Sequence, residues 1–217
     1  MWNDLEKGFQ IAFEKAWDAY RNNTVPIGVA VMDKTDTLMA TGQNQIYTDG
    51  GGVIKFHQIA HAEINAILNL SEIEDQNIRN HIRTFTLYST MEPCPLCFGA
   101  IVMGSIRNVK YAARDNYAGA TALNESIDYI KNKKIMVTGP FEEPEIVQIA
   151  MQTCFELKGE VSANTRDILL PSWIKICEKG VLIGKYLHEN RILQNMISHE
   201  FKNIYDFIMT VDLKRVQ

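Results

Sequence analysis

The sequence lacks long hydrophobic runs, a surplus of basic residues and a dense set of cysteines. Although 46% of its 217 residues are hydrophobic, none of its apolar runs is as long as a membrane-spanning helix requires. The 22 Lys+Arg against 26 Asp+Glu give a net charge of −4, so the composition carries no general attraction for phosphate backbones. Four cysteines are too few for a disulfide scaffold. The first ten residues carry acids where a secretory signal carries basic residues. Together these absences predict a cytoplasmic protein with no membrane partner.

The sequence does contain a regular alternation of strand and helix patterns. Apolar residues at helical spacing predict helices over 9–20, from 61, from 94 and over 144–158. Short runs rich in β-branched and apolar residues predict strands over 25–32, 37–41, 85–89, 108–113 and 134–138. Strands that alternate with helices favour an α/β sandwich, in which helices cover both faces of one sheet.

Residues 160–217 have a different character. They contain no convincing strand, and apolar residues recur there at helical spacing, namely Leu193, Ile197, Phe201, Ile204 and Ile208. This segment holds 8 Lys+Arg and 7 Asp+Glu, a balance of +1, which leaves −5 for residues 1–159. We therefore expect one domain over 1–159 and a helical C-terminal extension over 160–217, packed on the domain or at an interface.

Three residues of metal-ligating type stand in two short motifs. The segment HAE at 61–63 precedes the segment PCPLC at 93–97, and each begins a predicted helix. Zinc binds imidazole nitrogen and thiolate sulfur readily. Cys94 and Cys97 lie three residues apart, so their sulfurs can face one ion from a single helical turn. The proline between them suits the first position of a helix. We therefore predict a zinc site with His61, Cys94 and Cys97 as ligands.

Three protein ligands leave one position of a tetrahedral zinc site open. A structural site normally closes its shell with four protein ligands, whereas a catalytic site keeps one position for water. Zinc lowers the pKa of that water toward neutrality. Glu63 lies two residues after His61 at a helix start, where side chains lean toward the N-terminus and both can reach an ion off the helix end. A carboxylate in this place can take a proton from water and pass it to a departing amine.

Simpler interpretations compete with the catalytic one. The motif residues could form a structural zinc knuckle or be buried thiols, which the open fourth position and the neighbouring glutamate disfavour. His57 lies four residues before His61, but Gln58 stands where the zinc-protease motif has glutamate. We therefore place His57 at the surface or on the pocket rim. Cys154 and Cys177 fall in apolar helical patterns, so we expect them to be small buried side chains.

The order His-x-Glu and then Pro-Cys-x-x-Cys resembles the signature of zinc nucleobase deaminases. The segments VPIGVAV, HAEINAI and STMEPCPLCFGAIVMGSIRNVKYAARDNYAGA are similar to the cytidine deaminase-like superfamily, in the branch of tRNA-specific adenosine deaminases and bacterial guanine deaminases. The resemblance spans residues 5–158. It implies a three-layer α/β/α fold with a mixed five-stranded sheet, and a homodimer.

The resemblance also implies a role for each matched position. His61, Cys94 and Cys97 would hold one Zn²⁺ per chain, and Glu63 would shuttle the proton. Asn44 matches an asparagine that holds the substrate base, although on its own residue type it would be interpreted as a turn cap. The backbone amide of Ala62 would meet an acceptor on the base. The implied reaction is hydrolytic: hydroxide adds to the amine-bearing ring carbon, and ammonia leaves.

Two departures from the family pattern bear on the substrate. Sixteen residues, QIYTDGGGVIKFHQIA, separate Asn44 from His61, where relatives have about ten residues, and we expect this insertion at the pocket mouth. The last core helix, PEIVQIAMQTCFELKG, holds a single lysine, although Lys and Arg supply much of any nucleic-acid affinity. ARDNYAGA, in contrast, resembles the tRNA enzymes. We favour a purine base or nucleoside as substrate over wobble adenosine in tRNA, and we retain a catalytically idle zinc-held binding module as a remote alternative.

Overall fold

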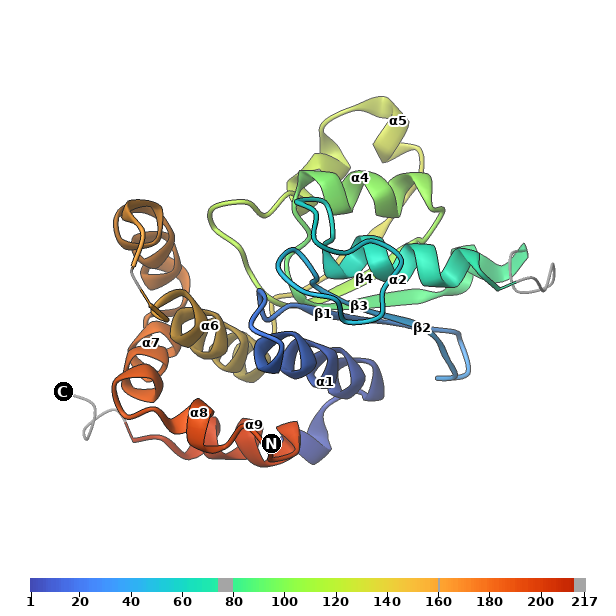
Figure 1. Ribbon diagram of the computed structural model, residues 1–217. Helices are drawn as coiled ribbons and strands as arrows, with labels where there is room; N and C mark the ends of the chain where they lie inside the picture. The colour runs from blue at the N-terminus through green and yellow to red at the C-terminus, as the bar shows by residue number, and fades with distance from the viewer. Residues whose placement is uncertain (74–79, 160, 213–217) are drawn as a thin grey trace.

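The structure is a computed structural model that describes residues 1–73, 80–159 and 161–212. A five-stranded sheet with the strand order β2-β1-β3-β4-β5 forms its centre. The strand β1 pairs antiparallel with both β2 and β3, whereas β3, β4 and β5 run parallel to one another. The sheet is therefore mixed, and Figure 1 shows it nearly edge-on with helices on both faces.

The elements follow one another in the order that the alternating pattern predicts. The strands are β1 (Gly28–Met32), β2 (Leu38–Gln43), β3 (Thr86–Met91), β4 (Asn108–Ala113) and β5 (Met136–Thr138). The helices of the sandwich are α1 (Lys7–Arg21), α2 (Ala62–Ser71), α4 (Pro95–Met103), α5 (Asp128–Lys131) and α6 (Glu142–Glu156). The C-terminal helices are α7 (Leu170–Glu189), preceded by a π-helical turn at Thr165–Leu169, α8 (Ile192–Asn195) and α9 (Phe201–Thr210).

The helices α2 and α4 cover one face of the sheet. Alternate residues of β1 and β3, among them Val29, Val31 and Leu87, point into this layer and pack against Ala66 of α2 and Ile101 of α4. All five residues of β1 are buried, because a strand with helices on both faces exposes neither of its sides. The two helices that carry the predicted metal ligands therefore share one apolar core.

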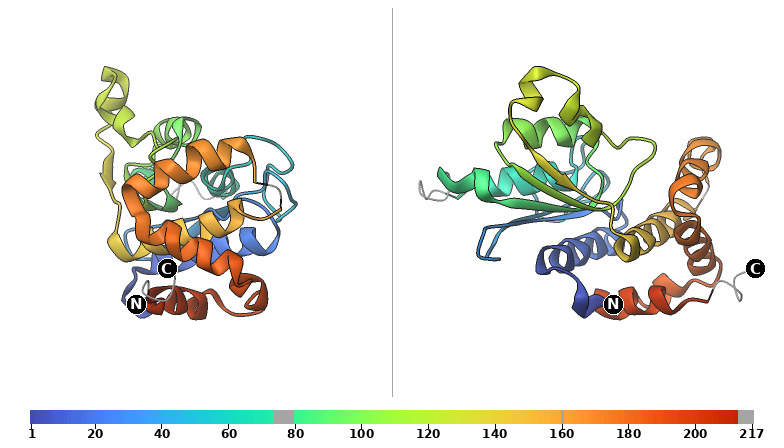
Figure 2. Two further views of the ribbon diagram at one scale, coloured as in Figure 1. Left: turned by 90° about the vertical axis from the view of Figure 1, so that its left-hand side faces the viewer. Right: turned by 180° about the vertical axis from the view of Figure 1, so that it is seen from behind.

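The helices α1 and α6 cover the opposite face, and the C-terminal helices pack outside them. One continuous core includes Phe13 and Trp17 of α1, Ile149 of α6, and Phe201 and Tyr205 of α9. Figure 2 shows α7, α8 and α9 along the outer side of α1 and α6, with α9 beside the first residues of the chain. This arrangement confirms the predicted three-layer sandwich with a helical C-terminal extension.

Two glycines allow helices to approach the sheet closely. A Cβ atom on Gly28 of β1 would overlap the backbone of α1 at Ala12, and a Cβ on Gly42 of β2 would overlap the backbone of α2 at Ala62. The two positions lie on adjacent strands and serve opposite faces. Gly42 therefore sets how closely the start of α2 approaches the end of β2.

Several helices and strands begin or end at residues other than the predicted ones. The strand expected over 25–32 begins only at Gly28, and the helix expected over 144–158 covers Glu142–Glu156 instead. The helical run from Leu193 to Ile208 is broken between α8 and α9, so Ile197 lies exposed outside both helices. In the part of the chain that the structure describes, no helix is both long and apolar enough to cross a membrane.

Candidate metal and catalytic site

The helices α2 and α4 begin at the same place, and each begins with a predicted ligand. His61 and Cys94 occupy the N-cap positions of α2 and α4, both with extended backbone. Pro95 takes the first helical position of α4, where a missing amide hydrogen costs nothing. Cys97 follows within the first turn. The predicted helix starts are confirmed, and they bring the three side chains together.

The three predicted ligands converge on one point. The Nδ1 atom of His61 lies 3.5 Å from Cys94 Sγ and 3.3 Å from Cys97 Sγ, and the three ligand atoms all lie within 4.8 Å of one another. Cys97 is fully buried, whereas Cys94 and His61 are half-buried. One nitrogen and two sulfur donors at this spacing match the donor set that zinc prefers, and three donors leave a fourth position for another ligand.

The electrostatics of the site favour a thiolate. A hydrogen bond from Cys97, together with a second from His61, lowers the pKa of the Cys94 thiol to about 4. The same contact with Cys94 raises the pKa of His61 above its ordinary value, against the effect of burial. Thiolates at a helix start are also favoured by the local amide dipoles. Cys94 is therefore ready to act as a metal ligand.

Glu63 lies against the cysteines and is 4% exposed. Its Oε2 accepts a hydrogen bond from Cys97 Sγ at 3.2 Å, and its Oε1 accepts one from Ser89 Oγ on β3 at 3.4 Å. Burial raises the pKa of this carboxyl above its ordinary value. A buried carboxyl beside the three converging ligands has the position that a proton shuttle requires. Ser89 was not identified from the sequence, because a serine in a strand carries no chemical signal of its own.

Asn44 is buried at the end of β2, next to the start of α2. Its Oδ1 accepts hydrogen bonds from Thr24 Oγ1 at 2.9 Å and from the Ile46 amide at 3.1 Å. The second bond makes Asn44 the turn cap that its residue type alone suggests. Among the residues that the structure describes, none accepts a hydrogen bond from Nδ2, so this amide is free to donate to a ligand.

The insertion, residues 45–60, is held by side-chain amides. Gln45 Oε1 accepts hydrogen bonds from the amides of Gly50 and Gly52, both at 3.1 Å. Asn65, fully buried on α2, accepts from the Ile54 amide at 2.9 Å and donates to the Gln43 carbonyl at 3.3 Å. Asn65 therefore joins the insertion and the end of β2 to the helix that carries His61. The three successive glycines at 50–52 are typical of irregular structure, but Gln45 and Asn65 were not identified from the sequence as the residues that hold the insertion.

Glu92 organises the loop that follows β4. Its carboxylate accepts hydrogen bonds from the Asp115 amide and from the amide and hydroxyl of Thr121. Because Glu92 lies two residues before Cys94, it ties residues 115–121 to the metal-ligand motif. Asp115 in turn caps the amides of Tyr117 and Ala118. Sequence reasoning missed Glu92, although its place directly before the Pro-Cys motif is a signal that could have found it.

The remaining sequence-based assignments fall as follows. His57 is exposed and uses Nδ1 to accept the Ile59 amide at 3.2 Å, as expected for a surface histidine. Cys154 and Cys177 are buried and form no disulfide, as expected for small buried side chains. Ala62 is the first residue of α2, a position whose amide has no partner within the helix.

Comparison with known proteins agrees with this geometry. Residues 2–113 match the family described as the cytidine and deoxycytidylate deaminase zinc-binding region. The chain is 25% identical to a cytosine deaminase of Candida albicans over 157 residues, which are 72% of this chain and 88% of that protein. It is 30% identical to a tRNA-specific adenosine deaminase of Haemophilus influenzae over 167 residues, which are 76% of this chain and 90% of that protein.

Two of the solved structures that the chain matches are deaminases. One is a tRNA:A34 deaminase that edits the wobble position, at 24% identity and a TM-score of 0.48, covering 64% of this chain and 94% of the other. Another is a guanine deaminase from Nitrosomonas europaea, at 21% identity and a TM-score of 0.48, covering 68% and 81%. From the family match over 2–113 and the 30% identity across most of a relative, the chain belongs to the cytidine and deoxycytidylate deaminase family of zinc-binding enzymes.

Proposed function

We propose that the protein is a zinc-dependent hydrolase that deaminates an aminated purine base or nucleoside and releases ammonia. The observation that carries the proposal is the convergence of His61, Cys94 and Cys97 within 4.8 Å of one another, with the carboxyl of Glu63 against Cys97. Three ligands and an adjacent buried carboxyl are the parts that hydrolytic deamination requires.

Each of these residues has a distinct task in the proposed reaction. His61, Cys94 and Cys97 would hold one zinc ion per chain, which supplies Lewis-acid activation of water at neutral pH. Glu63 accepts the proton of the attacking water and delivers it to the departing amine. The free Nδ2 of Asn44 and the free amide of Ala62 donate hydrogen bonds to the base, and so fix its amine-bearing carbon beside Glu63.

The charge distribution supports a small substrate. The helix α6 contains no lysine or arginine, and its first turn carries Glu142, Glu143 and Glu145. Residues 1–159 together have a balance of −5. A polynucleotide gains much of its affinity from Lys and Arg contacts to phosphates, and this surface offers few of them.

Wobble-adenosine deamination of tRNA is the second candidate. It is favoured by the 30% identity with a protein named as a tRNA-specific adenosine deaminase. A gel-shift with tRNA at moderate salt, run beside an ammonia-release assay on free nucleosides, separates the two. Binding of tRNA without ammonia release from any nucleoside would overturn the small-substrate proposal.

The direct test is ammonia release from a panel of adenine, guanine, cytosine and their nucleosides, using protein of measured zinc content. We expect about one zinc per chain and release from at least one purine compound. Full zinc content with no ammonia from any member of the panel or from tRNA would favour the remote alternative, a catalytically idle zinc-held binding module.

The protein is also proposed to form a homodimer through the face that carries α4 and α5, at the top of Figure 1. Leu96, Met103 and Ile127 on or beside these helices are each exposed, and the Tyr129 hydroxyl contacts Met103 Sδ at 3.4 Å. Exposed apolar side chains that contact one another, as Tyr129 and Met103 do, are suited to an interface, and these residues support the choice of this face. Light scattering of the wild type and of Met103→Asp should show dimer and monomer respectively, whereas Leu38→Asp, at the far edge of the sheet, should leave the dimer intact.

We further propose that residues 1–159 form the deaminase domain and that 160–217 form an extension of it. The packing of α7 and α9 on α6 and α1, rather than on the metal-ligand helices, supports this division.

A further inference from the structure

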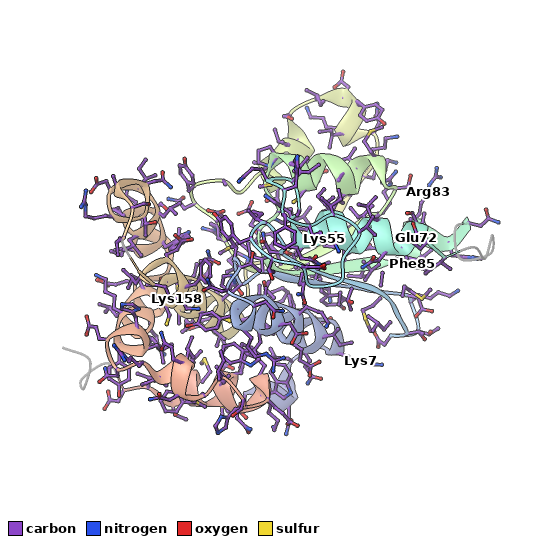
Figure 3. All side chains as sticks on the ribbon, viewed as in Figure 1. Lys7, Lys55, Glu72, Arg83, Phe85 and Lys158 are labelled. Atoms are coloured by element: carbon purple, nitrogen blue, oxygen red, sulfur yellow. The ribbon has the colours of Figure 1, made fainter. Side chains whose placement is uncertain are left out.

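The loop over residues 114–121, which follows β4, borders the candidate site. β4 pairs in parallel with β3, and ligands of such sheets bind outside the carboxyl ends of the strands. The Ala120 amide donates to the Pro93 carbonyl at 3.0 Å, and Pro93 directly precedes the predicted ligand Cys94. In Figure 3, Lys55 marks the insertion well to the right of this loop. The loop and the insertion are therefore separate borders of the site.

Both ends of this loop are fixed to one carboxylate. Glu92 Oε2 accepts a hydrogen bond from the Asp115 amide at 3.2 Å, and Glu92 Oε1 accepts one from the Thr121 amide at 3.2 Å. A Cβ atom on Gly119 would overlap the Glu92 carboxylate, so the glycine allows the loop to close onto it. The middle of the loop depends instead on Asp115, whose Oδ1 accepts two of the loop's own amides at 3.0 and 3.1 Å.

The C-terminal extension meets the middle of this loop. Asn116 Nδ2 donates a hydrogen bond to the Ser172 carbonyl, in the first turn of α7, at 3.4 Å. The next residue of α7, Trp173, is 3% exposed, and its indole acts on the Asp115 carboxyl. Burial raises the pKa of that carboxyl, and the indole N–H is among the donors that oppose the rise. Figure 2 shows the yellow-green loop reaching toward the first half of α7.

The indole N–H of Trp173 is buried without a well-aligned hydrogen bond to any residue that the structure describes. A buried N–H normally has a partner, and one without calls for an explanation. The Asp115 carboxylate has an acceptor to offer, because its Oδ1 serves the amides of Tyr117 and Ala118, whereas no described residue donates a printed side-chain or backbone hydrogen bond of good geometry to Oδ2. A small movement of the loop toward α7 would complete this bond.

We propose that Trp173 is a positioning residue of the candidate site: its indole N–H fixes the Asp115 carboxyl, and Asp115 fixes the loop against the backbone that leads into Cys94. Trp173 acts through the loop and not on the substrate. The extension thereby shapes one border of a site whose family match ends at residue 113. This inference rests on the proposed deamination for its effect on turnover, but the order of the loop can be measured without any substrate.

Trp173→Phe tests the proposal, because it keeps an aromatic ring and removes the N–H. The first readout is hydrogen exchange of the amides over 114–121 in the zinc-loaded full chain, followed by mass spectrometry. We expect exchange to become about tenfold faster, the effect of losing a hydrogen bond to a charged group. The matched control is Trp17→Phe. Trp17 belongs to the same core, is 2% exposed and donates its indole N–H to the His199 carbonyl at 3.1 Å, so its loss should leave exchange of the loop unchanged.

The second readout is the turnover of whichever base, nucleoside or tRNA the wild type deaminates. We expect Trp173→Phe to raise KM about tenfold and to leave kcat and zinc content close to those of the wild type. A general loss of stability does not produce this split between KM and kcat. Asn116→Ala removes the other hydrogen bond between the loop and α7. Because Asn116 is exposed, this variant keeps the core intact, and it should change exchange and KM in the same direction even if Trp173→Phe does not fold.

The two readouts separate this inference from the proposed function. Equal exchange of the loop in Trp173→Phe and Trp17→Phe would overturn the inference while leaving the deaminase proposal untouched. Faster exchange with an unchanged KM would also overturn it, because the loop would then be held by Trp173 without any effect on the substrate. If the wild type deaminates no compound, the proposed function fails, and the exchange rates alone decide whether Trp173 holds the loop.

Discussion

The amide of Gln45 donates a hydrogen bond to the carbonyl of Ala60, with an N···O distance of 2.8 Å. These are the first and last residues of the insertion, so this bond closes the segment on itself. Asn44 directly precedes it and His61 directly follows it. The insertion therefore adds surface beside the candidate site without separating the residue expected to hold the base from the first metal ligand.

Asn65→Ala should loosen the insertion. The change removes the side-chain partners of the Ile54 amide and the Gln43 carbonyl, and we expect a loss of about 1–3 kcal/mol in the free energy of unfolding. Trypsin should then cleave faster after Lys55, the one lysine or arginine in the sequence of the insertion. Asn69→Ala is the control, since Asn69 bonds only the Thr41 carbonyl on β2. Equal cleavage rates in the two variants would contradict the role of Asn65.

Gly42→Ala should force α2 away from β2. The added Cβ would overlap the backbone at Ala62 and Ala66, neither of which can rotate aside as a side chain does. We expect a loss of about 1–3 kcal/mol, measured by urea unfolding. The control is Gly99→Ala in α4, where a Cβ meets nothing within 4 Å and helix propensity should add about 0.5–1 kcal/mol. If Gly42→Ala has the same free energy of unfolding as the wild type, β2 and α2 can move apart without cost.

Glu63→Gln should abolish turnover while zinc stays bound. The amide keeps the size of the side chain but cannot carry the proton, and loss of general acid–base catalysis lowers rates about 100-fold or more. Ammonia release and zinc content should be measured on the same sample. The control is Glu72→Gln, at the exposed C-cap of α2, which should retain both turnover and bound zinc. A Glu63→Gln protein that stays active would refute the proposed mechanism.

Cys97→Ala should lose the metal. The remaining two ligands do not hold zinc tightly, so zinc content should fall well below one per chain and the melting temperature should lose its response to added zinc. Cys154→Ala is the control, because Cys154 is equally buried but contacts Tyr20 on the far side of the sheet. It should keep its zinc. Full zinc content in Cys97→Ala would exclude Cys97 as a ligand.

Phe201→Ala should destabilise the whole chain. Phe201 is 2% exposed, stacks on Phe13 at 5.6 Å and meets Trp2 edge-on at 5.9 Å, so its removal should lower the free energy of unfolding by about 3–5 kcal/mol. Ile197→Ala is the comparison, since Ile197 is 41% exposed and should change stability by about 0.5 kcal/mol or less. A loss in Phe201→Ala no larger than that in Ile197→Ala would contradict the role of Phe201 in joining α9 to α1.

The predictions from sequence succeeded where short-range patterns decide the structure. The strand over 108–113 has the predicted bounds, and both ligand-bearing helices begin where predicted. The proline after Cys94 favours the start of α4 locally, and the family resemblance supplied the expectation that the two starts meet. The assignment of Asn44 depends on that same resemblance, whereas the role of Glu63 also followed from its place at the helix start beside His61.

The long-range contacts were not predictable from one sequence. Ser89, Glu92 and Asn65 all support the candidate site, yet each acts through partners more than ten residues away. Polar residues of these types are common in strands and helices, so only the fold shows which of them are buried and paired. For Ile197 the local pattern was misleading. Its helical spacing predicted a buried position, but it lies in the turn between α8 and α9 and is exposed.

The contact between the two ends of the fold has a consequence for biosynthesis. Trp2 packs on Phe201 and Tyr205, and the Trp2 amide donates to Asp206. During translation, domains form from the N-terminus onward, so the outer aromatic side of α1 emerges from the ribosome long before its cover exists. The outer side of α1, with Phe13 and Trp17, therefore stays exposed until α9 has been synthesised and has packed on it. During that interval it is an apolar surface of the kind that chaperones recognise.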